Sequence, residues 1–151
     1  PIPKQADFQT AFSSAMGDVF AGQPQSYELA MQATKAYYTG AAAQRGDISG
    51  EVNSRLMKDA IKASVGEVVD FNGSSTLAPW GMSGDKFEQI ARDQLVNTMK
   101  AQGMSEKEQA LASAFSLRQF KDGVYYVMQG QQFKYGADGK PLMINVNEAN
   151  Q

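Results

Sequence analysis

The sequence lacks two residue types altogether: its 151 residues include no cysteine and no histidine. Without cysteine the chain can form no disulfide, zinc finger, iron–sulfur site or thiol nucleophile. Without histidine it can support neither Ser-His-Asp nor Cys-His catalysis, and no imidazole can hold a metal. These two absences exclude most enzyme classes and leave carboxylate chemistry as the main catalytic possibility.

The chain also lacks an excess of positive charge and a long apolar run. Lys and Arg number 14 against 16 Asp and Glu, a net charge of −2, so we expect no specific nucleic-acid binding. No run approaches the roughly 20 apolar residues that a membrane-spanning helix needs, so no transmembrane segment is expected. The start, Pro1 to Lys4, resembles neither a signal peptide nor a native initiator, and predicts a processed product or a fragment of a longer chain.

The composition is that of a folded protein. A hydrophobic fraction of 42% with 20% charged residues excludes disordered, collagen-like and coiled-coil classes. The length is near the commonest domain size, and no repeat or linker divides the chain. We therefore predict a single domain over residues 1–151, of the α+β class, with helices first and most strands last.

Apolar residues at helical spacing predict about five helices. The first three run from Phe8 to Phe20, from a cap at Ser26 to Arg45-Gly46, and from Val52 to Gly66, with short turns that favour an antiparallel bundle. Ser83 is expected to cap a fourth helix that Gly103 closes, and a capping box from Ser105 to Glu108 opens a short fifth helix through Leu111.

Two segments have the pattern of β-structure. Residues 67–77 predict a short central hairpin, because a β-branched run is followed by the turn signal Asn72-Gly73. Near the C-terminus, Val124–Met128 is a β-rich run, and a glycine turn at 136–139 predicts a hairpin between 132–135 and 142–146. These strands predict a C-terminal antiparallel sheet, and we expect residues 147–151 to be frayed.

Aromatic residues are the candidates for an interaction site. Tyr37 and Tyr38 could form a stacking platform, although aromatic residues at helical spacing more often belong to the core. Trp80, the only tryptophan, lies in a loop between the central hairpin and the fourth helix. It could stack on a carbohydrate or anchor a partner, or it could be an aromatic plug that docks the hairpin on the helices, and we favour the plug.

No catalytic, cofactor or metal site is predicted. Glycosidase chemistry needs two carboxylates on either side of a substrate, and the acids nearest to apolar stretches form no such pair: Glu28, Glu51, Glu67, Asp70 and Glu88. Asp47, Ser49 and Glu51 alternate, but they lack the spacing of a calcium loop and are explained by turn chemistry.

Several segments are similar to one family of large phage proteins. The segments are Gly17-Asp18-Val19-Phe20-Ala21-Gly22, Pro24-Gln25-Ser26-Tyr27, Lys35-Ala36-Tyr37-Tyr38, Ala42-Ala43-Gln44-Arg45-Gly46-Asp47 and Ala78-Pro79-Trp80-Gly81-Met82, with Asp122-Gly123-Val124-Tyr125 and Asp138-Gly139-Lys140-Pro141 near the end. Over roughly residues 11 to 146, the chain resembles the C-terminal region of internal virion proteins of tailed phages and prophages, many of them associated with lytic transglycosylase activity.

The resemblance implies a context and no catalysis, because no stretch matches the glutamate motif of the lytic domain. It implies a non-catalytic structural or interaction module of a virion-associated protein, made in the bacterial cytoplasm and carried in the phage particle during genome ejection or cell-wall passage. The implied partners are other virion proteins or copies of this chain. The alternative is a peptidoglycan-binding or lytic accessory domain, in which Trp80 with Tyr37 or Tyr38 would contact glycan.

Overall fold

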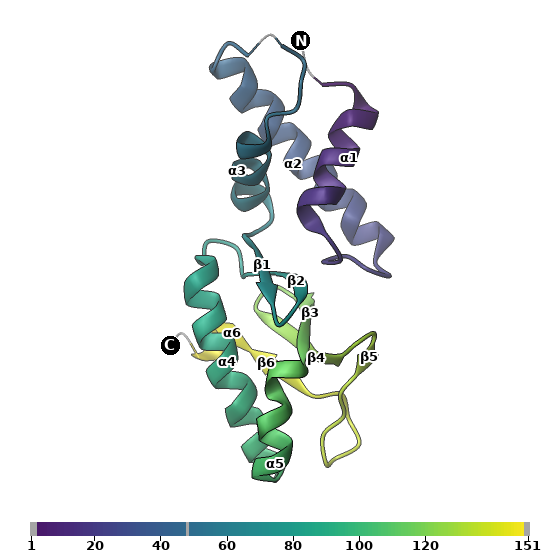
Figure 1. Ribbon diagram of the computed structural model, residues 1–151. Helices are drawn as coiled ribbons and strands as arrows, with labels where there is room; N and C mark the ends of the chain where they lie inside the picture. The colour runs from purple at the N-terminus through teal and green to yellow at the C-terminus, as the bar shows by residue number, and fades with distance from the viewer. Residues whose placement is uncertain (1–2, 48, 150–151) are drawn as a thin grey trace.

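The computed structural model describes residues 3–47 and 49–149 and shows two lobes joined by a β-hairpin (Figure 1). We call the first the helical lobe; it consists of α1 (Gln5–Met16), α2 (Pro24–Gln44) and α3 (Ser54–Ser64). The hairpin of β1 (Val68–Phe71) and β2 (Ser74–Leu77) follows. The second is the sheet lobe, which holds α4 to α6 and strands β3 to β6. The predicted α+β class, with helices first, a central hairpin and a C-terminal antiparallel sheet, is confirmed.

The three helices of the helical lobe bury the residues that the periodicity selects. Phe8, Phe12 and Met16 of α1 are buried against α2 and α3. The second helix begins at Pro24 and not at a cap on Ser26, because proline suits the first helical position, where its missing N–H costs nothing. The third is capped by Asn53, whose side chain accepts a hydrogen bond from the Leu56 amide at 2.9 Å.

The central hairpin has the predicted turn and register. Asn72 and Gly73 form its turn with positive φ angles of 52° and 92°, as a two-residue hairpin requires. The antiparallel pairing runs from Val68 opposite Leu77 to Phe71 opposite Ser74.

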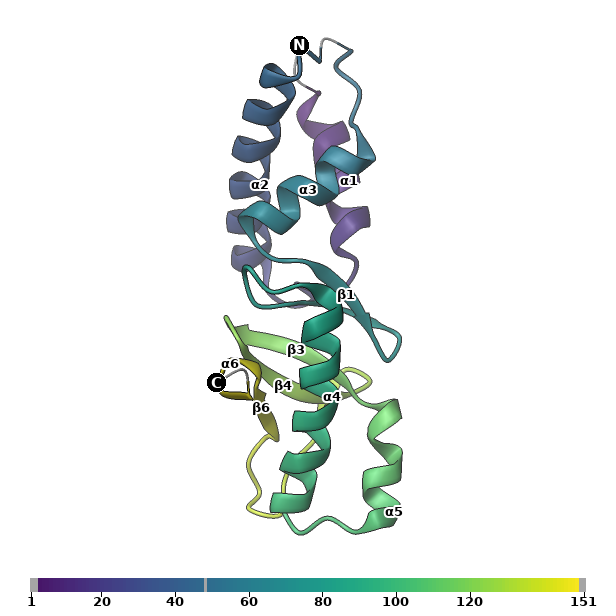
Figure 2. The same cartoon turned by 90° about the vertical axis from the view of Figure 1, so that its left-hand side faces the viewer.

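The sheet lobe begins with α4 (Gly84–Ala101), whose cap is Ser83 as predicted. The capping box at Ser105 is also confirmed; it opens α5 (Glu106–Gln109), which continues as a 3₁₀ turn over Ala110–Ala114. Viewed after a 90° turn, α4 passes in front of β3 and β4 and crosses them, and its buried side chains share a core with the sheet (Figure 2).

The strands of this lobe differ from the expectation in two ways. Strand β3 (Ser116–Lys121) was not predicted, and it pairs along β4 (Val124–Gln129). The segments expected to pair as a hairpin contain β5 (Gln132–Phe133) and β6 (Met143–Asn145), and both strands pair with β4. The arm between them closes through a bridge from Tyr135 to Pro141. The expected hairpin therefore forms next to its turn, where the Leu142 amide donates to the Lys134 carbonyl at 2.7 Å, while β5 and β6 themselves pair with β4 and not with each other.

The end of the chain is more ordered than expected. Residues 146–149 form α6 (Val146–Ala149), and Val146 is buried in the core of the sheet lobe. The prediction of fraying is wrong for this turn, because Val146 anchors it, while residues 150 and 151 lie outside the described residues.

The described residues form two hydrophobic clusters, and the hairpin contributes to both. Leu77 belongs to the cluster of the helical lobe. Phe71 and Ala78 belong to the cluster of the sheet lobe, with Phe87 of α4 and Tyr125 of β4. Because side chains on successive strand residues point to opposite faces, a hairpin of four-residue strands can join the two cores. The prediction of a single domain over residues 1–151 stays a prediction.

Candidate functional site

Trp80 lies on the surface, in the loop between β2 and α4, with 64% of the residue exposed. The preferred hypothesis, a buried aromatic plug, is therefore wrong. The hairpin docks on the helices through Leu77 and Val68, and on the sheet lobe through Phe71 and Ala78.

One hydrogen bond holds the exposed indole of Trp80, and a second holds its backbone. Its Nε1–H donates to the carbonyl of Ala63 at 2.9 Å, near the C-terminal end of α3, where carbonyl groups have no partner within the helix. Its backbone N–H donates to Asp122 Oδ1 in the turn between β3 and β4 at 3.0 Å. An apolar ring that is both exposed and fixed loses little conformational freedom on binding, which favours a role as an anchor.

A shallow hollow of about 350 Å³ lies beside the indole. Its lining combines apolar and charged side chains from α3 and from the loops around the hairpin: Asp59, Lys62, Ala63, Glu67, Trp80, Gly81 and Met82. A second hollow of about 430 Å³ shares Asp59, Lys62 and Glu67 and extends to Ala15 and Val68. We call these two hollows together the Trp80 groove.

Charged groups line the middle of the Trp80 groove. Lys62 Nζ lies 3.4 Å from Glu67 Oε1, and Asp59 Oδ2 lies 3.9 Å from the guanidinium of Arg45. Glu67 also accepts a hydrogen bond from the Gly84 amide at the start of α4. Exposed ion pairs of this kind stabilise the fold by at most about 1 kcal/mol, so these groups can exchange partners when a ligand arrives.

The structure separates the two tyrosines of the candidate platform. Tyr38 is 1% exposed, and its hydroxyl accepts from the Asn53 amide at 2.8 Å and donates to the Glu51 carbonyl at 3.4 Å. Tyr37 is 46% exposed on α2. The core interpretation holds for Tyr38 and is wrong for Tyr37, and Tyr38 is too deeply buried to contact a glycan.

Four of the five acids near apolar stretches have structural partners, Glu67 among them. Glu88 forms an ion pair with Arg92 at 2.7 Å, Asp70 accepts from the Gly73 amide at 2.8 Å in the hairpin turn, and Glu28 accepts from Gln32 at 3.3 Å. In the part of the chain that the structure describes, no group of three or more acidic side chains is placed to hold a metal ion.

The pKa values of Asp47 and Tyr125 are displaced by structural contacts and burial. Hydrogen bonds from the backbone and hydroxyl of Ser49 lower the pKa of Asp47, which is the opposite of what a general acid requires. Burial, reinforced by the charge of Asp122, raises the pKa of Tyr125. Its hydroxyl donates to the Leu77 carbonyl at 2.5 Å and so ties β4 to the hairpin.

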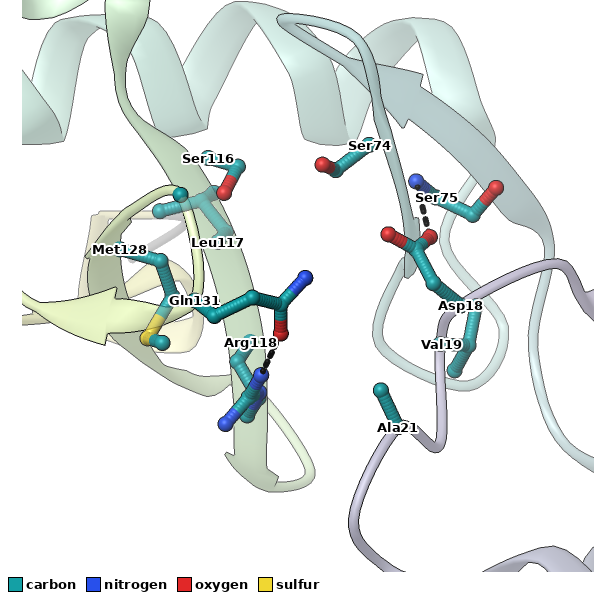
Figure 3. A pocket seen from close by; sticks show the side chains of 11 residues that line it. Asp18, Val19, Ala21, Ser74, Ser75, Ser116, Leu117, Arg118, Met128 and Gln131 are labelled. Atoms are coloured by element: carbon teal, nitrogen blue, oxygen red, sulfur yellow. Dashed lines mark hydrogen bonds between the residues drawn. The ribbon is translucent and has the colours of Figure 1, made fainter.

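A polar hollow at the boundary of the two lobes is too small for a ligand (Figure 3). Asp18, from the turn after α1, accepts from the Ser75 amide at 2.8 Å on one side of it. Arg118 donates to Gln131 Oε1 at 3.2 Å on the other side. The space amounts to about 20 Å³, enough for about one water molecule, so we regard this hollow as part of the seam between the lobes.

A second exposed surface was missed in the sequence. The rings of Phe120, Tyr126 and Phe133 form a continuous strip across β3, β4 and β5, with centroids 5.4 and 4.7 Å apart. We call these three residues the aromatic strip. The two adjacent tyrosines of the β-rich run were a signal for it, because one of them must lie on each face of a strand. The strip also needs β3, which was not predicted.

The comparisons with known proteins give no match. A scan against protein-family models, a search of curated proteins and a search of solved structures each find nothing similar to this chain. Among the described helices, none is both long and apolar enough to cross a membrane.

Proposed function

We propose that this chain is a non-catalytic interaction module of a phage virion-associated protein. In this role it binds other virion proteins or further copies of itself, during genome ejection or passage through the cell wall. The virion context rests on the sequence resemblance over roughly residues 11 to 146. The interaction role rests on the Trp80 groove.

The observation that carries the proposal is a tryptophan both exposed and fixed. Trp80 is 64% exposed, while its two N–H groups donate to Ala63 and Asp122. Tryptophan dominates the energetics of many protein interfaces, where a few anchors supply most of the affinity. Met82 and Ala63 beside it give the groove an apolar end, and Asp59, Lys62 and Glu67 in its middle offer charged groups for polar contacts with a partner.

The arrangement of the acids supports a role without catalysis. Glu28, Glu88 and Asp70 serve as partners of nearby side chains or amides, and Glu67 accepts from the amide that opens α4. A glycosidase acid needs a proton at neutral pH, which requires an apolar pocket. Glu67, the groove's most enclosed carboxylate, is instead partly exposed and lies 3.4 Å from the ammonium group of Lys62.

Sedimentation velocity over a concentration series tests binding between copies. We expect the wild type to self-associate and Trp80→Ala to stay monomeric at the same concentrations. Trp80→Phe keeps an aromatic ring and should retain part of the association. Tyr37→Ala removes an exposed aromatic ring that is not among the residues lining the groove and should have no effect, which makes it the matched control. If Trp80→Ala associates as strongly as the wild type, the groove is not the interface.

A second candidate function is binding of peptidoglycan glycan at the same groove. The exposure of Trp80 favours it, because a buried ring could not stack on a sugar, and Asp59 and Glu67 offer acceptors for sugar hydroxyl groups beside the ring. Tyr38 is excluded from this site by its burial, and Tyr37 lies on α2, outside the residues that line the groove.

Co-sedimentation with purified peptidoglycan distinguishes the two functions. Retention of the wild type with loss of Trp80→Ala would support the glycan function, and absence of retention would eliminate it. The same samples, assayed for release of soluble muropeptides, test the non-catalytic claim. Release that a single Glu67→Gln substitution abolishes would overturn that claim.

A further inference from the structure

The aromatic strip lies on the face of the sheet opposite α4. Tyr125 and Val127 of β4 are buried towards α4, so the alternating residues Tyr126 and Met128 lie on the other face. On that face Tyr126 is paired with Arg118 of β3 and Met143 of β6. We call it the outer face of the sheet.

The outer face carries more exposed aromatic surface than a solvated sheet face usually does. Phe120 is 54% exposed, Phe133 is 37% exposed and Tyr126 is half-buried between them. Contiguous exposed apolar patches on a soluble protein mark binding sites. The rings belong to three neighbouring strands, so they are held by the ladder of the sheet and not by a mobile loop.

The strands of the outer face carry charge of one sign, although Asp18 of the helical lobe lies across the seam hollow from Arg118. Strands β3, β4, β5 and β6 contain Arg118 and Lys121 and no Asp or Glu, although the whole chain has a net charge of −2. Lys121 is paired with Val124, which places it on the same face as Tyr126. Arg118 is oriented by its hydrogen bond to Gln131 at 3.2 Å. The surface therefore complements an anionic ligand that has flat apolar parts.

We propose that the outer face binds single-stranded nucleic acid without sequence preference. Exposed aromatic rings on a sheet, flanked by cations, are the arrangement by which proteins stack unpaired bases and track the phosphate backbone. In a duplex the bases stack on one another and leave no free face for an aromatic ring. The rings can therefore stack on the bases of a single strand and not on those of a double helix. This differs from specific recognition, which the net charge led us not to expect, and it uses residues outside the Trp80 groove.

Fluorescence anisotropy with a labelled oligothymidine of about twelve nucleotides, within the site sizes of single-strand binding domains, tests the proposal. We expect binding at low salt that Tyr126→Ala weakens about tenfold, the value of one base–ring stack. Phe120→Ser changes a residue that is already exposed, so the fold tolerates it, and it should weaken binding by a similar factor. Tyr37→Ala on α2 should leave the affinity unchanged.

The salt dependence gives a second, independent readout. Two phosphate contacts predict a slope of log K against log salt of about −1.4, and Arg118→Gln or Lys121→Gln should reduce its magnitude by about 0.7. Absence of binding up to about 10⁻⁴ M protein, the weak end of non-specific binding, would overturn the proposal. The proposal would also be overturned if a duplex bound as tightly as the single strand, or if poly-glutamate displaced the oligothymidine as well as unlabelled oligothymidine does. Neither result requires stacking on the aromatic rings.

Discussion

At the scale of single residues, exposure separates side chains that the sequence treats alike. Tyr37 and Tyr38 are adjacent and chemically identical, yet one is 46% and the other 1% exposed. The helical periodicity of α2 places Tyr38 on the buried face with Met31 and Thr34. Alanines on both sides of the helix hide the edge of that face, so the sequence does not show that Tyr37 lies beyond it. The burial of Tyr38 was therefore predictable, and the exposure of Tyr37 was not.

The tyrosine pair yields a matched test of stability. Tyr38→Phe removes a hydroxyl that binds the Asn53 amide and the Glu51 carbonyl, so we expect the free energy of unfolding to fall by about 1–3 kcal/mol, the cost of leaving such groups unpaired. Tyr37→Phe should change it by less than about 0.5 kcal/mol. Urea denaturation measures both, and equal effects would contradict the structural role of the Tyr38 hydroxyl.

Two glycines give a second matched pair. Gly66, between α3 and β1, has φ of 148°, and a Cβ there would lie 2.5 Å from the Ala78 carbonyl oxygen. Gly66→Ala should therefore destabilise the protein by about 1–3 kcal/mol. Gly40 lies in α2 with open space around it, so Gly40→Ala should stabilise by about 0.5–1 kcal/mol. Thermal melts of both variants check the opposite signs, and a shift of Tm in the same direction would contradict them.

At the scale of elements, the starts of helices were easier to predict than the strands. Ser83 was identified as a cap because a short polar side chain precedes an apolar series, and Ser105 because Glu108 completes a capping box with it. Both caps form. Strand β3 was missed because the alanine-rich 3₁₀ turn before it resembles a continuing helix. The strand itself, Ser116–Lys121, also contains no β-branched residue that would indicate β-structure. Because Phe120 belongs to β3, the aromatic strip was not predicted either.

The cap of α3 provides a prediction at this scale. Asn53→Ala removes the side-chain oxygen that accepts from the Leu56 amide at 2.9 Å, so the free energy of unfolding should fall by about 1 kcal/mol. Asn53→Asp keeps an acceptor at the same position and should retain most of the stability. If both substitutions cost the same, the cap contributes nothing through this hydrogen bond.

At the scale of the whole molecule, the central hairpin couples two cores. It supplies Leu77 to one and Phe71 to the other, and the Tyr125 hydroxyl binds its Leu77 carbonyl from the sheet lobe. Asp18 of the helical lobe binds the Ser75 amide. The sequence predicted this hairpin, but not that its opposite faces would serve different cores, because such packing depends on contacts far apart along the chain.

This coupling predicts cooperative unfolding of the chain as one unit. Calorimetry should show one transition, with the calorimetric enthalpy equal to the van't Hoff enthalpy. Tyr125→Phe, which removes about 1 kcal/mol of hydrogen bonding at the hairpin, should lower Tm while leaving one transition. Two separate transitions in the wild type would show that the lobes unfold independently and would contradict the prediction of a single domain.

Trp80 is an exposed residue whose two N–H groups bind Ala63 and Asp122, so it links α3 to the sheet lobe. It is also the centre of the proposed interface. The most direct test of that interface is sedimentation velocity of the wild type against Trp80→Ala, with Tyr37→Ala as the control. We predict that the wild type and the control associate with rising concentration while Trp80→Ala stays monomeric. Equal association of all three proteins would contradict the role of the Trp80 groove as the interface.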